Sequence, residues 1–358
     1  MDGTHIHFQW SPDFSLAGFR AGASLHSHTL RSREPLALLY RAARGSWALQ
    51  TLLRYAERRF QASYGTPLDL SRGWWIPPLA PLDAHVLECG QMEAMGLSPF
   101  VSLTDHDNIE AALELLALGV GLPVPISIEW TVPIQKTAFH LGVHNLPPLR
   151  ARSIVRAMQD FTAKPARAVL REILAGLHTI PSVLVVLNHP LWDESGVGAE
   201  IHRAALLELL GTCSRHLHAI ELNGLRPWAE NRQAIQLART WSKPVVAGGD
   251  RHGLEPNVML NLAATLHFAE FVTQVREGHS TVMIGNRYRA AHWRRILHSV
   301  ADVVRTYEAR ALGRRRWSDR VFYRFDNGDV KSFSEIWRGC PPLPVADTPL
   351  MVSRFGFE

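Results

Sequence analysis

The sequence predicts an α/β protein whose core is a barrel of parallel strands. Short apolar segments alternate with helical segments between about residues 81 and 284. Such alternation is typical of parallel sheets, and this number of units favours a barrel. The chain of 358 residues is long enough for one large barrel, and its 46% hydrophobic content is that of a globular protein.

The N-terminal part is predicted to contribute one strand before the regular alternation of strands and helices begins. Residues 1–23 are expected to form an irregular arm, followed by a strand up to about Thr29. An insertion at 34–80 is predicted to begin as helix and to end as a loop that contains Trp74 and Trp75. We expect these tryptophans to pack the insertion onto the barrel, with stacking on a nucleobase as the alternative.

The regular part of the fold is predicted from hydrophobic periodicity. Helices are expected where apolar residues recur every three or four positions, and strands where apolar runs are short. The predicted strands are 100–104, 124–130, 139–143, 182–187, 219–223, 244–247 and 281–284. The predicted helices are 81–95, 109–118, 149–177 with a break at Pro165, 200–210, 229–241 and 270–277. Polar clusters follow most of these strands, at the end where barrel enzymes place their active sites.

The alternation stops after the last of these strands. We expect a helix over 290–311, a β-hairpin over 320–332 and an irregular, proline-rich segment over 339–358. The predicted organisation is a barrel domain at 1–286, carrying the insertion at 34–80, and a C-terminal extension at 287–358.

Charge and cysteine content restrict the environment and the partners. A net charge of +5 is modest for this length, so it permits an anionic substrate without requiring nucleic acid. Three widely spaced cysteines form no zinc-type spacing and suit a reducing compartment. The N-terminus lacks a signal-peptide pattern, and no apolar run is long enough for a bilayer. We therefore expect a cytoplasmic protein without a membrane partner. The sequence leaves the oligomeric state open.

The first candidate site is the His-x-His pair at His26 and His28. Residues i and i+2 of a strand point to the same face, so the two imidazoles would lie side by side as a metal clamp. Taken alone the pair is weak evidence, because the chain has 18 histidines and other His-x-His pairs. The pair becomes stronger evidence for a metal site because further candidate ligands occur later in the chain.

Further histidines and carboxylates follow the later strands. They are His106, Glu129, His140, His189, Asp250 and His252. Mixed nitrogen and oxygen donors suit zinc, manganese or iron, and there are too many donors for one tetrahedral ion. We expect two or three divalent metal ions with a bridging carboxylate, which would activate a water molecule for hydrolysis.

The order of these motifs resembles the polymerase and histidinol phosphatase (PHP) family of metal-dependent phosphoesterases. The matching motifs are His-x-His at 26–28, Thr-Asp-His-Asp at 104–107, Glu129, His-Leu-Gly at 140–142, Asn-His-Pro at 188–190 and Gly-Asp-x-His at 249–252. The resemblance covers about residues 20–286. It implies a distorted (β/α)7, TIM-like barrel and hydrolysis of a phosphate mono- or diester by a metal-activated hydroxide.

The resemblance also distributes eight ligands among the metals. The implied groups are His26, His28, Glu129 and Asp250 around one ion, Glu129, His140 and His189 around a second, and His106 with His252 at a third. The chain departs from the family just after His28, where an acidic ligand is expected and the sequence reads Ser32-Arg33-Glu34. Because arginine cannot ligate a cation, either Glu34 takes that place or the third ion is weak or absent.

Further roles are expected for residues beside the ligands. The catalytic candidates are His106, Asp250 and His252. Either histidine could serve as general acid if metal does not fully engage it. Arg251 is a candidate phosphate contact, because a guanidinium matches phosphate oxygens bidentately; the alternative is a surface arginine. Asn223 and Glu34 are the other candidate substrate contacts.

Four more polar residues have expected roles near the same rim. Glu221 is expected either to support a ligand or to contact substrate. Asp105 is expected to orient a ligand, Asp107 to cap the following helix and His144 to face solvent from a loop.

The sequence therefore predicts a cytoplasmic metal-dependent phosphoesterase. A small phosphorylated metabolite, a nucleotide or an oligonucleotide end all fit as substrate. Two alternatives remain. One is an amidohydrolase-like metalloenzyme that cleaves a carbon–nitrogen bond, and the other is a non-catalytic binding module that keeps a PHP-like fold.

Overall fold

The structure is a computed structural model that describes residues 3–36, 47–121, 123–307 and 313–337. The chain divides into two compact units. Unit 1 consists of Met1–Ser32 and Leu79–Ser299, and unit 2 consists of Arg33–Pro78 and Val300–Glu358. Among the described residues, every helix is too short or too polar to cross a lipid bilayer.

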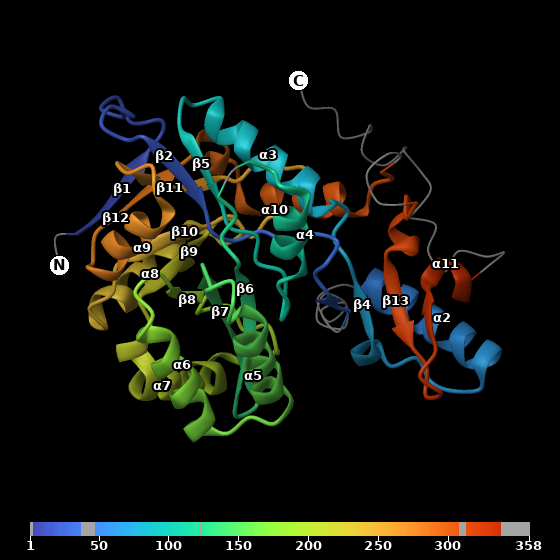
Figure 1. Ribbon diagram of the computed structural model, residues 1–358. Helices are drawn as coiled ribbons and strands as arrows, with labels where there is room; N and C mark the ends of the chain where they lie inside the picture. Colours follow the sequence, from blue (N-terminus) through green and yellow to red (C-terminus); the bar gives the residue numbers. More distant parts are fainter. Residues whose placement is uncertain (1–2, 37–46, 122, 308–312, 338–358) are drawn as a thin grey trace. The chain divides into compact units, whose positions relative to one another are not determined.

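Unit 1 contains two five-stranded sheets (Figure 1). The first has the order β1 (Thr4–Phe8), β12 (Ser280–Ile284), β11 (Met259–Ala263), β2 (Ala21–Ser24) and β5 (Ser98–Val101). The second has the order β10 (Val245–Gly248), β9 (Ala219–Asn223), β8 (Leu184–Asn188), β7 (Thr137–His144) and β6 (Ile128–Ile134). The predicted α/β class is confirmed.

The prediction of uniformly parallel strands is wrong. β2–β5, β8–β9, β9–β10 and β1–β12 are parallel, whereas β7 is antiparallel to both of its neighbours and so is β11. β6 and β7 are antiparallel because only a turn at Gln135 and Lys136 connects them. A turn this short can join only antiparallel strands, because a parallel pair needs a crossover.

The two sheets meet at two isolated bridges, Ser27↔Arg251 and His106↔Glu129. The first bridge links the segments that follow β2 and β10, and the second links the segment after β5 to β6. When these two bridges are counted with the sheet pairings, seven strands follow one another in a ring: β2, β5, β6, β7, β8, β9 and β10. Since each joint is a single bridge, the described strands are grouped in two sheets, and the distorted (β/α)7 barrel stays a prediction.

Helices cover the outer face of the second sheet. The helices of unit 1 are α3 (Pro81–Glu93), α4 (Glu110–Leu118), α5 (Ala151–Ala163), α6 (Arg167–His178), α7 (Ala199–Cys213), α8 (Trp228–Thr240) and α9 (Phe268–Arg276). Short 3-10 turns lie at Ser214–His216 and Asn286–Arg289, and α10 (His292–Val304) runs across the boundary of the two units. The predicted helix 149–177 is two helices, because Pro165 disfavours helical backbone at the residue before it.

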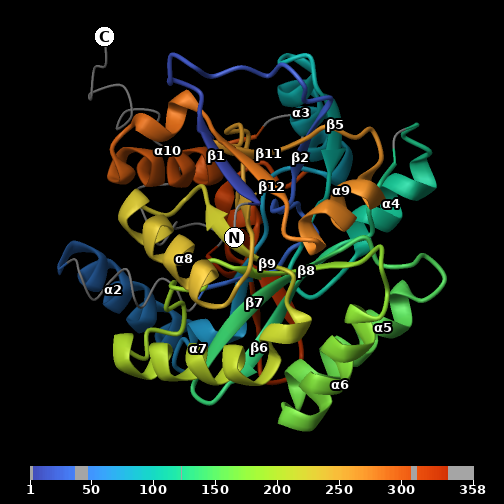
Figure 2. The same ribbon diagram turned by 90° about the vertical axis from the view of Figure 1, so that its left-hand side faces the viewer.

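The alternation of side chains along β8 shows how the core is layered. Val185 and Leu187 pack with α5, α6 and α7, which lie outside the strands in Figure 2. Leu184 and Val186 point the other way, against the buried faces of β2 and β5. Because β8 is buried on both faces, its sequence is a continuous apolar run, and its polar residues occur where the strand ends.

Unit 2 joins the insertion to the C-terminal extension. Its sheet has the order β14 (Val330–Ser332), β13 (Val321–Arg324), β4 (Gly73–Trp75) and β3 (Glu34–Pro35), all antiparallel. Its helices are α2 (Trp47–Tyr64) and α11 (Phe333–Ile336), with 3-10 turns at Leu70–Arg72 and Trp317–Asp319. β13 and β14 form the predicted hairpin. Trp74 stacks on Phe322 with ring centroids 5.7 Å apart, so this tryptophan packs within unit 2.

Candidate metal centre

Six of the eight predicted metal ligands follow the carboxyl ends of strands in unit 1. Glu129 is instead the second residue of β6 and His140 lies inside β7, so the prediction of a strand that ends near Glu129 is wrong. The positions of all eight are His26 and His28 after β2, His106 after β5, Glu129 on β6, His140 on β7, His189 after β8, and Asp250 and His252 after β10. Every one of these side chains is buried or nearly so.

The carboxylate of Glu129 is at the centre of this group and is 1% exposed. Its two oxygens face five imidazole nitrogens at distances of 3.1 to 3.6 Å: Nε2 of His26, His28 and His189, and Nδ1 of His106 and His140. These five histidines come from four segments of the chain, because His26 and His28 share the segment after β2. A carboxylate with both oxygens directed at imidazoles on either side has the arrangement expected of a bridging ligand.

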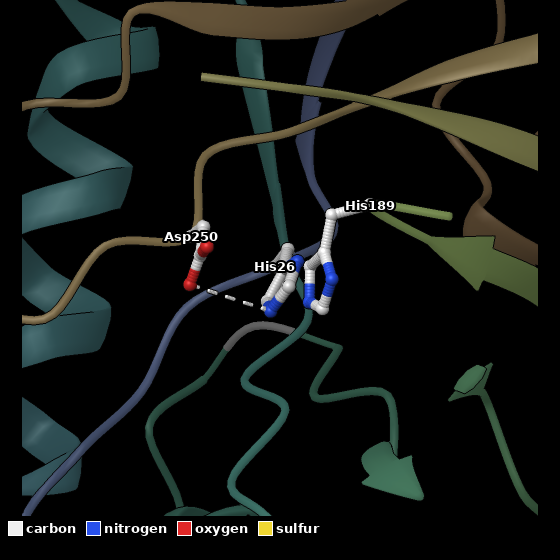
Figure 3. A group of neighbouring side chains, drawn as sticks. All are labelled: His26, His189 and Asp250. Carbon is white, nitrogen blue, oxygen red and sulfur yellow. Dashed lines mark ion pairs between the residues drawn. The ribbon is translucent and has the colours of Figure 1, made fainter. Parts of the chain in front are cut away.

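Asp250 completes the group. Its Oδ1 lies 3.6 Å from Nε2 of His28 and 3.7 Å from Nε2 of His26. Figure 3 shows Asp250 pointing toward His26, whose ring lies beside that of His189 at 5.7 Å between centroids. His252 reaches the same oxygen with Nδ1 at 3.6 Å.

The eight residues form four overlapping groups in which three donor atoms converge closely enough to hold an ion. The groups are His26, His189 and Asp250; His26, His28 and Glu129; His28, Asp250 and His252; and His106, Glu129 and His140. Imidazole and carboxylate donors suit zinc, manganese or iron. The donor set therefore fits more than one divalent ion.

Outer partners set the orientation of two of the imidazoles. Nδ1 of His26 lies 2.6 Å from Oε1 of Glu221, and Nε2 of His140 lies 3.4 Å from Oε2 of Glu194. A proton held at these outer nitrogens leaves the lone pair of the opposite nitrogen directed toward Glu129. This carboxylate–histidine arrangement is the usual support of a metal-ligating imidazole.

Opposite charges at the centre displace the pKa values strongly. Burial lowers the pKa of His26, but Glu129, Glu221 and Asp250 outweigh burial and raise it well above its usual value. Burial raises the pKa of Glu129, but His26, His106 and His140 outweigh it and lower the pKa well below its usual value. The Glu129 carboxylate is therefore ionised and able to neutralise cations at neutral pH.

Backbone strain coincides with this group. His189 and Asp250 have φ angles of 24° and 52°, in the left-handed region that residues with a side chain rarely adopt. Such strain persists only where the surroundings hold the residue in place, and it clusters at functional sites. Here the Asp250 amide donates to the His26 carbonyl oxygen at 2.8 Å, and the His189 amide donates to Oε2 of Glu221 at the same distance.

Glu221 has a supporting role that the sequence analysis left open. Besides His26 and the His189 amide, its carboxylate accepts from Nδ2 of Asn223 at 3.1 Å. Gly248 makes room for it, because a Cβ at that position would lie 1.6 Å from Oε1 of Glu221. The sequence signal for Glu221 was its place at the end of an apolar strand. Glu194 had no such signal, since it lies in a loop, and the sequence analysis missed it.

Two of the three candidate substrate contacts, Asn223 and Arg251, are engaged by other residues of unit 1. Asn223 is fully buried and its Nδ2 donates to Glu221 and to Oδ2 of Asp250, so it supports carboxylates. Glu34 is on β3 and belongs to unit 2.

Arg251 turns away from its two ligand neighbours. Its side chain is buried, with Nε donating to Oε1 of Glu88 at 2.7 Å and one terminal nitrogen donating to the carbonyl oxygen of Gly253 at 2.6 Å. This geometry gives no support to the predicted phosphate contact, and the alternative of a surface arginine is wrong. The ion pair instead anchors the Asp250–His252 segment to α3.

Three neighbouring residues also have assignable positions. Asp105 accepts from the amide and the hydroxyl of Thr29, at 2.6 and 2.7 Å, which fixes the chain just past His28. The prediction that Asp107 caps α4 is wrong, because its Oδ1 accepts from the Thr131 amide. The prediction that His144 faces solvent is also wrong. It is 1% exposed on β7, with Nδ1 2.8 Å from the Ser102 hydroxyl.

Comparison with known proteins adds distant structural similarities. No protein-family model and no curated protein matches the chain. The structure of PsfC from Pseudomonas syringae PB-5123 is similar over 79% of this chain and 97% of its own, with a TM-score of 0.41 and 14% identity. Two others each cover 50% of this chain and 84% of their own, with a TM-score of 0.32 and 15% identity: a candidate metal-dependent phosphoesterase from Bifidobacterium adolescentis, and an amidohydrolase from Chromobacterium violaceum with bound sulfate and no metal. Similarities at this level do not assign an activity to the chain.

Proposed function

We propose that the protein is a metal-dependent phosphoesterase that hydrolyses a phosphate mono- or diester. The observation that carries this proposal is the convergence of five imidazoles on the buried carboxylate of Glu129, with Asp250 and His252 beside them. Burying so many ionisable groups together is costly for a fold, and cations bound between them would offset that cost.

The proposed ligands are the eight that the sequence analysis selected: His26, His28, His106, Glu129, His140, His189, Asp250 and His252. Bound divalent ions would supply Lewis acidity, both to make water nucleophilic near neutral pH and to neutralise phosphoryl oxygens. Whether two or three ions bind is left to measurement, because Arg33 stands where the PHP pattern has an acidic ligand.

The chain's own residues would orient and protect this chemistry. Glu221 and Glu194 hold His26 and His140 in position through their outer nitrogens. His106 and His252 have the most exposed side chains among the histidines of the group, at 12% and 14%. They are therefore the imidazoles placed to contact a substrate, and one of them would protonate the leaving oxygen if metal does not occupy it.

The expected substrate is a small phosphorylated metabolite or a nucleotide, with an oligonucleotide end as a further candidate. A cytoplasmic location remains a prediction from the sequence. No observation in the structure favours a carbon–nitrogen bond over a phosphate ester as the target, so the amidohydrolase-like alternative enters the test.

The test combines metal analysis with a substrate panel. The purified protein is analysed for bound metal and then assayed on aryl phosphates, phosphodiesters and amides, with manganese, zinc and iron supplied in turn. We expect at least two ions per chain and phosphate release. Asp250→Ala should abolish this activity and lower the metal content, whereas Asp160→Ala, on the exposed side of α5, should not. Amide cleavage instead would favour the amidohydrolase-like alternative, and absence of metal would favour a binding module.

A further inference from the structure

Two residues of the ligand-bearing motifs, Gly142 and Asn188, are not among the eight proposed ligands. Gly142 ends the His-Leu-Gly motif, and Asn188 begins the Asn-His-Pro motif. Both lie on the second sheet, Gly142 within β7 and Asn188 as the last residue of β8. Asn188 is 2% exposed, so its amide requires hydrogen-bond partners inside the protein.

The strand register places Asn188 on the same face of the sheet as two of the ligands. Glu129 of β6 lies opposite Gly142 of β7, and His140 of β7 lies opposite Asn188 of β8, in antiparallel pairs. Directly opposite residues point to the same face, and so do residues two positions apart on one strand. Glu129, His140, Gly142 and Asn188 therefore share one face of the sheet.

The amide of Asn188 donates a hydrogen bond to the carboxylate of Glu129. Its Nδ2 lies 2.9 Å from Oε1 of Glu129, and both residues are buried. The carboxylate is ionised and can only accept, so the nitrogen of the amide and not its oxygen must face it. The bond spans β7, because the strands of the two residues are separated by two strand spacings, which is roughly 9–10 Å.

This bond passes over Gly142, where the intervening strand has no side chain. A Cβ at this position would lie 3.0 Å from Oδ1 and 3.3 Å from Nδ2 of Asn188, and 2.8 Å from Nε2 of His144. Contacts this short would displace at least one of these two buried side chains. The glycine therefore leaves the space that the Asn188 amide needs to reach Glu129.

The same bond makes the two oxygens of the Glu129 carboxylate unequal. Oε2 faces three imidazoles and Oε1 faces two. They are those of His26, His28 and His106 for Oε2, and those of His140 and His189 for Oε1. Among the described residues, only Oε1 also accepts from a side chain outside the proposed ligand set, the amide of Asn188. A neutral amide keeps its protons when a cation binds nearby, so it holds Oε1 in place.

We propose that Asn188 is a positioning residue that holds Glu129 as a bridge between two metal ions. A carboxylate that is free to rotate about its last bond could direct both oxygens at one ion. The amide fixes this rotation, so that each oxygen serves its own set of histidines. The inference rests on the proposed metal centre and adds to it the group that determines how Glu129 binds.

The test measures metal binding and the electron paramagnetic resonance spectrum of the protein loaded with Mn²⁺ alone. Two manganese ions that share a carboxylate bridge are magnetically coupled, so the unmodified protein should give the spectrum of a coupled pair. Asn188→Leu keeps a side chain of similar size and removes the donor. We expect loss of the coupled signal and an affinity for the more weakly held ion about 10- to 100-fold lower, measured by competition with a chelator.

Gly142→Ala tests the same bond without removing a polar group. The added methyl group should displace the Asn188 amide and lower the metal affinity in the same direction. If both substitutions act through the Glu129–Asn188 bond, their effects are not additive. The double variant should then bind manganese no more weakly than Asn188→Leu does.

Asn145→Ala is the matched control. It also removes an amide hydrogen bond from the second sheet, the one to the carbonyl oxygen of Ser182, just beyond the end of β7 that is distant from the ligands. The variant should be less stable, but its metal affinity and its coupled signal should equal those of the unmodified protein. A role of Asn188 in stability alone would give the same result for both asparagine variants.

Several results would overturn the proposal. They are an unchanged coupled signal and affinity in Asn188→Leu, equal losses in Asn145→Ala, or an uncoupled or single manganese ion in the unmodified protein. If Asn188→Leu does not fold, unchanged metal binding in Gly142→Ala would contradict the assignment. Absence of bound metal in the unmodified protein would refute the proposed function as well. Coupled ions without phosphate release would contradict the proposed activity and leave the role of Asn188 standing.

Discussion

The two ends of β8, β9 and β10 use the same residue type in opposite electrostatic settings. At the carboxyl ends, carboxylates face the histidines and raise the pKa of His26 and His189 against the effect of burial. At the amino ends, burial and neighbouring cations both lower the pKa of His178 and His216, and they lower that of His218 to about 3. A histidine-rich sequence therefore does not imply a metal site. The sign of the surrounding charge decides whether the effect of burial on an imidazole is opposed or reinforced.

The largest effect is expected from the buried ion pair that supports the carboxyl end. The side chains of Glu88 and Arg251 are 1% and 2% exposed, so Glu88→Gln leaves the arginine charge buried without its partner. We expect a loss of about 3–5 kcal/mol in the free energy of unfolding, measured by urea denaturation. Glu114→Gln, which breaks the more exposed pair with Arg31, should cost under about 1 kcal/mol.

A double variant distinguishes a role of the Glu88–Arg251 pair in stabilising the fold from a role in positioning the Asp250–His252 segment. Glu88→Met combined with Arg251→Met should recover most of the stability, since apolar replacements of a buried pair are often neutral. If this variant also retains the full metal content, the pair serves the fold and not the Asp250–His252 segment.

The next effect concerns the carboxyl end of β9. Glu221→Gln removes the charge that holds Nδ1 of His26, and loss of such an outer partner typically lowers metal affinity about 10- to 100-fold. Competition with a chelator measures this change. Unaltered affinity would remove Glu221 from the support of the centre.

Another effect concerns the other end of the same strand and appears only in the pH dependence. The pKa of His218 is about 3 in the folded protein against 6.5 for the free side chain, so below pH 6.5 the unfolded chain binds the extra proton. Stability is therefore lost as the pH falls from 6.5, by up to about 1.4 kcal/mol per pH unit for this residue. Urea midpoints between pH 7 and pH 4 should fall less steeply in His218→Gln. Equal slopes in the variant and the unmodified protein would show that protonation of His218 does not destabilise the fold.

The sequence analysis selected the ligand group because strand ends can be recognised in sequence. An apolar run that stops at Asn188 or Gly248 indicates where a buried strand reaches the surface of its sheet. Polar residues immediately after such runs must share one edge when neighbouring strands are parallel. This is why residues as distant as His26 and Asp250 were grouped before any coordinates, and why the structure brings them within 3.7 Å.

Side-chain direction in the connecting segments was not predictable in the same way. Arg251 lies between two ligand residues, yet it points to α3, because its partner Glu88 is 163 positions away in sequence. The left-handed backbone at Asp250, with φ at 52°, also changes the alternation that a regular strand would give. His144 was assigned to a loop because the length of β7 was underestimated by one residue at its carboxyl end.

By itself, the sequence determined the α/β class, the carboxyl ends of β8, β9 and β10 to within one residue, and the eight residues of the candidate metal centre, because these depend on local hydrophobic periodicity and on residue chemistry. The sequence analysis missed β1, which lies in the predicted irregular arm, and β11, and it placed the strand at 124–130 about four residues before β6. The tertiary structure alone decided which strands are antiparallel, which charges surround each histidine cluster and where Arg251 points. These features depend on partners that are distant along the chain, such as Glu221 for His26 and Lys243 for His218, and a local pattern carries no information about such partners.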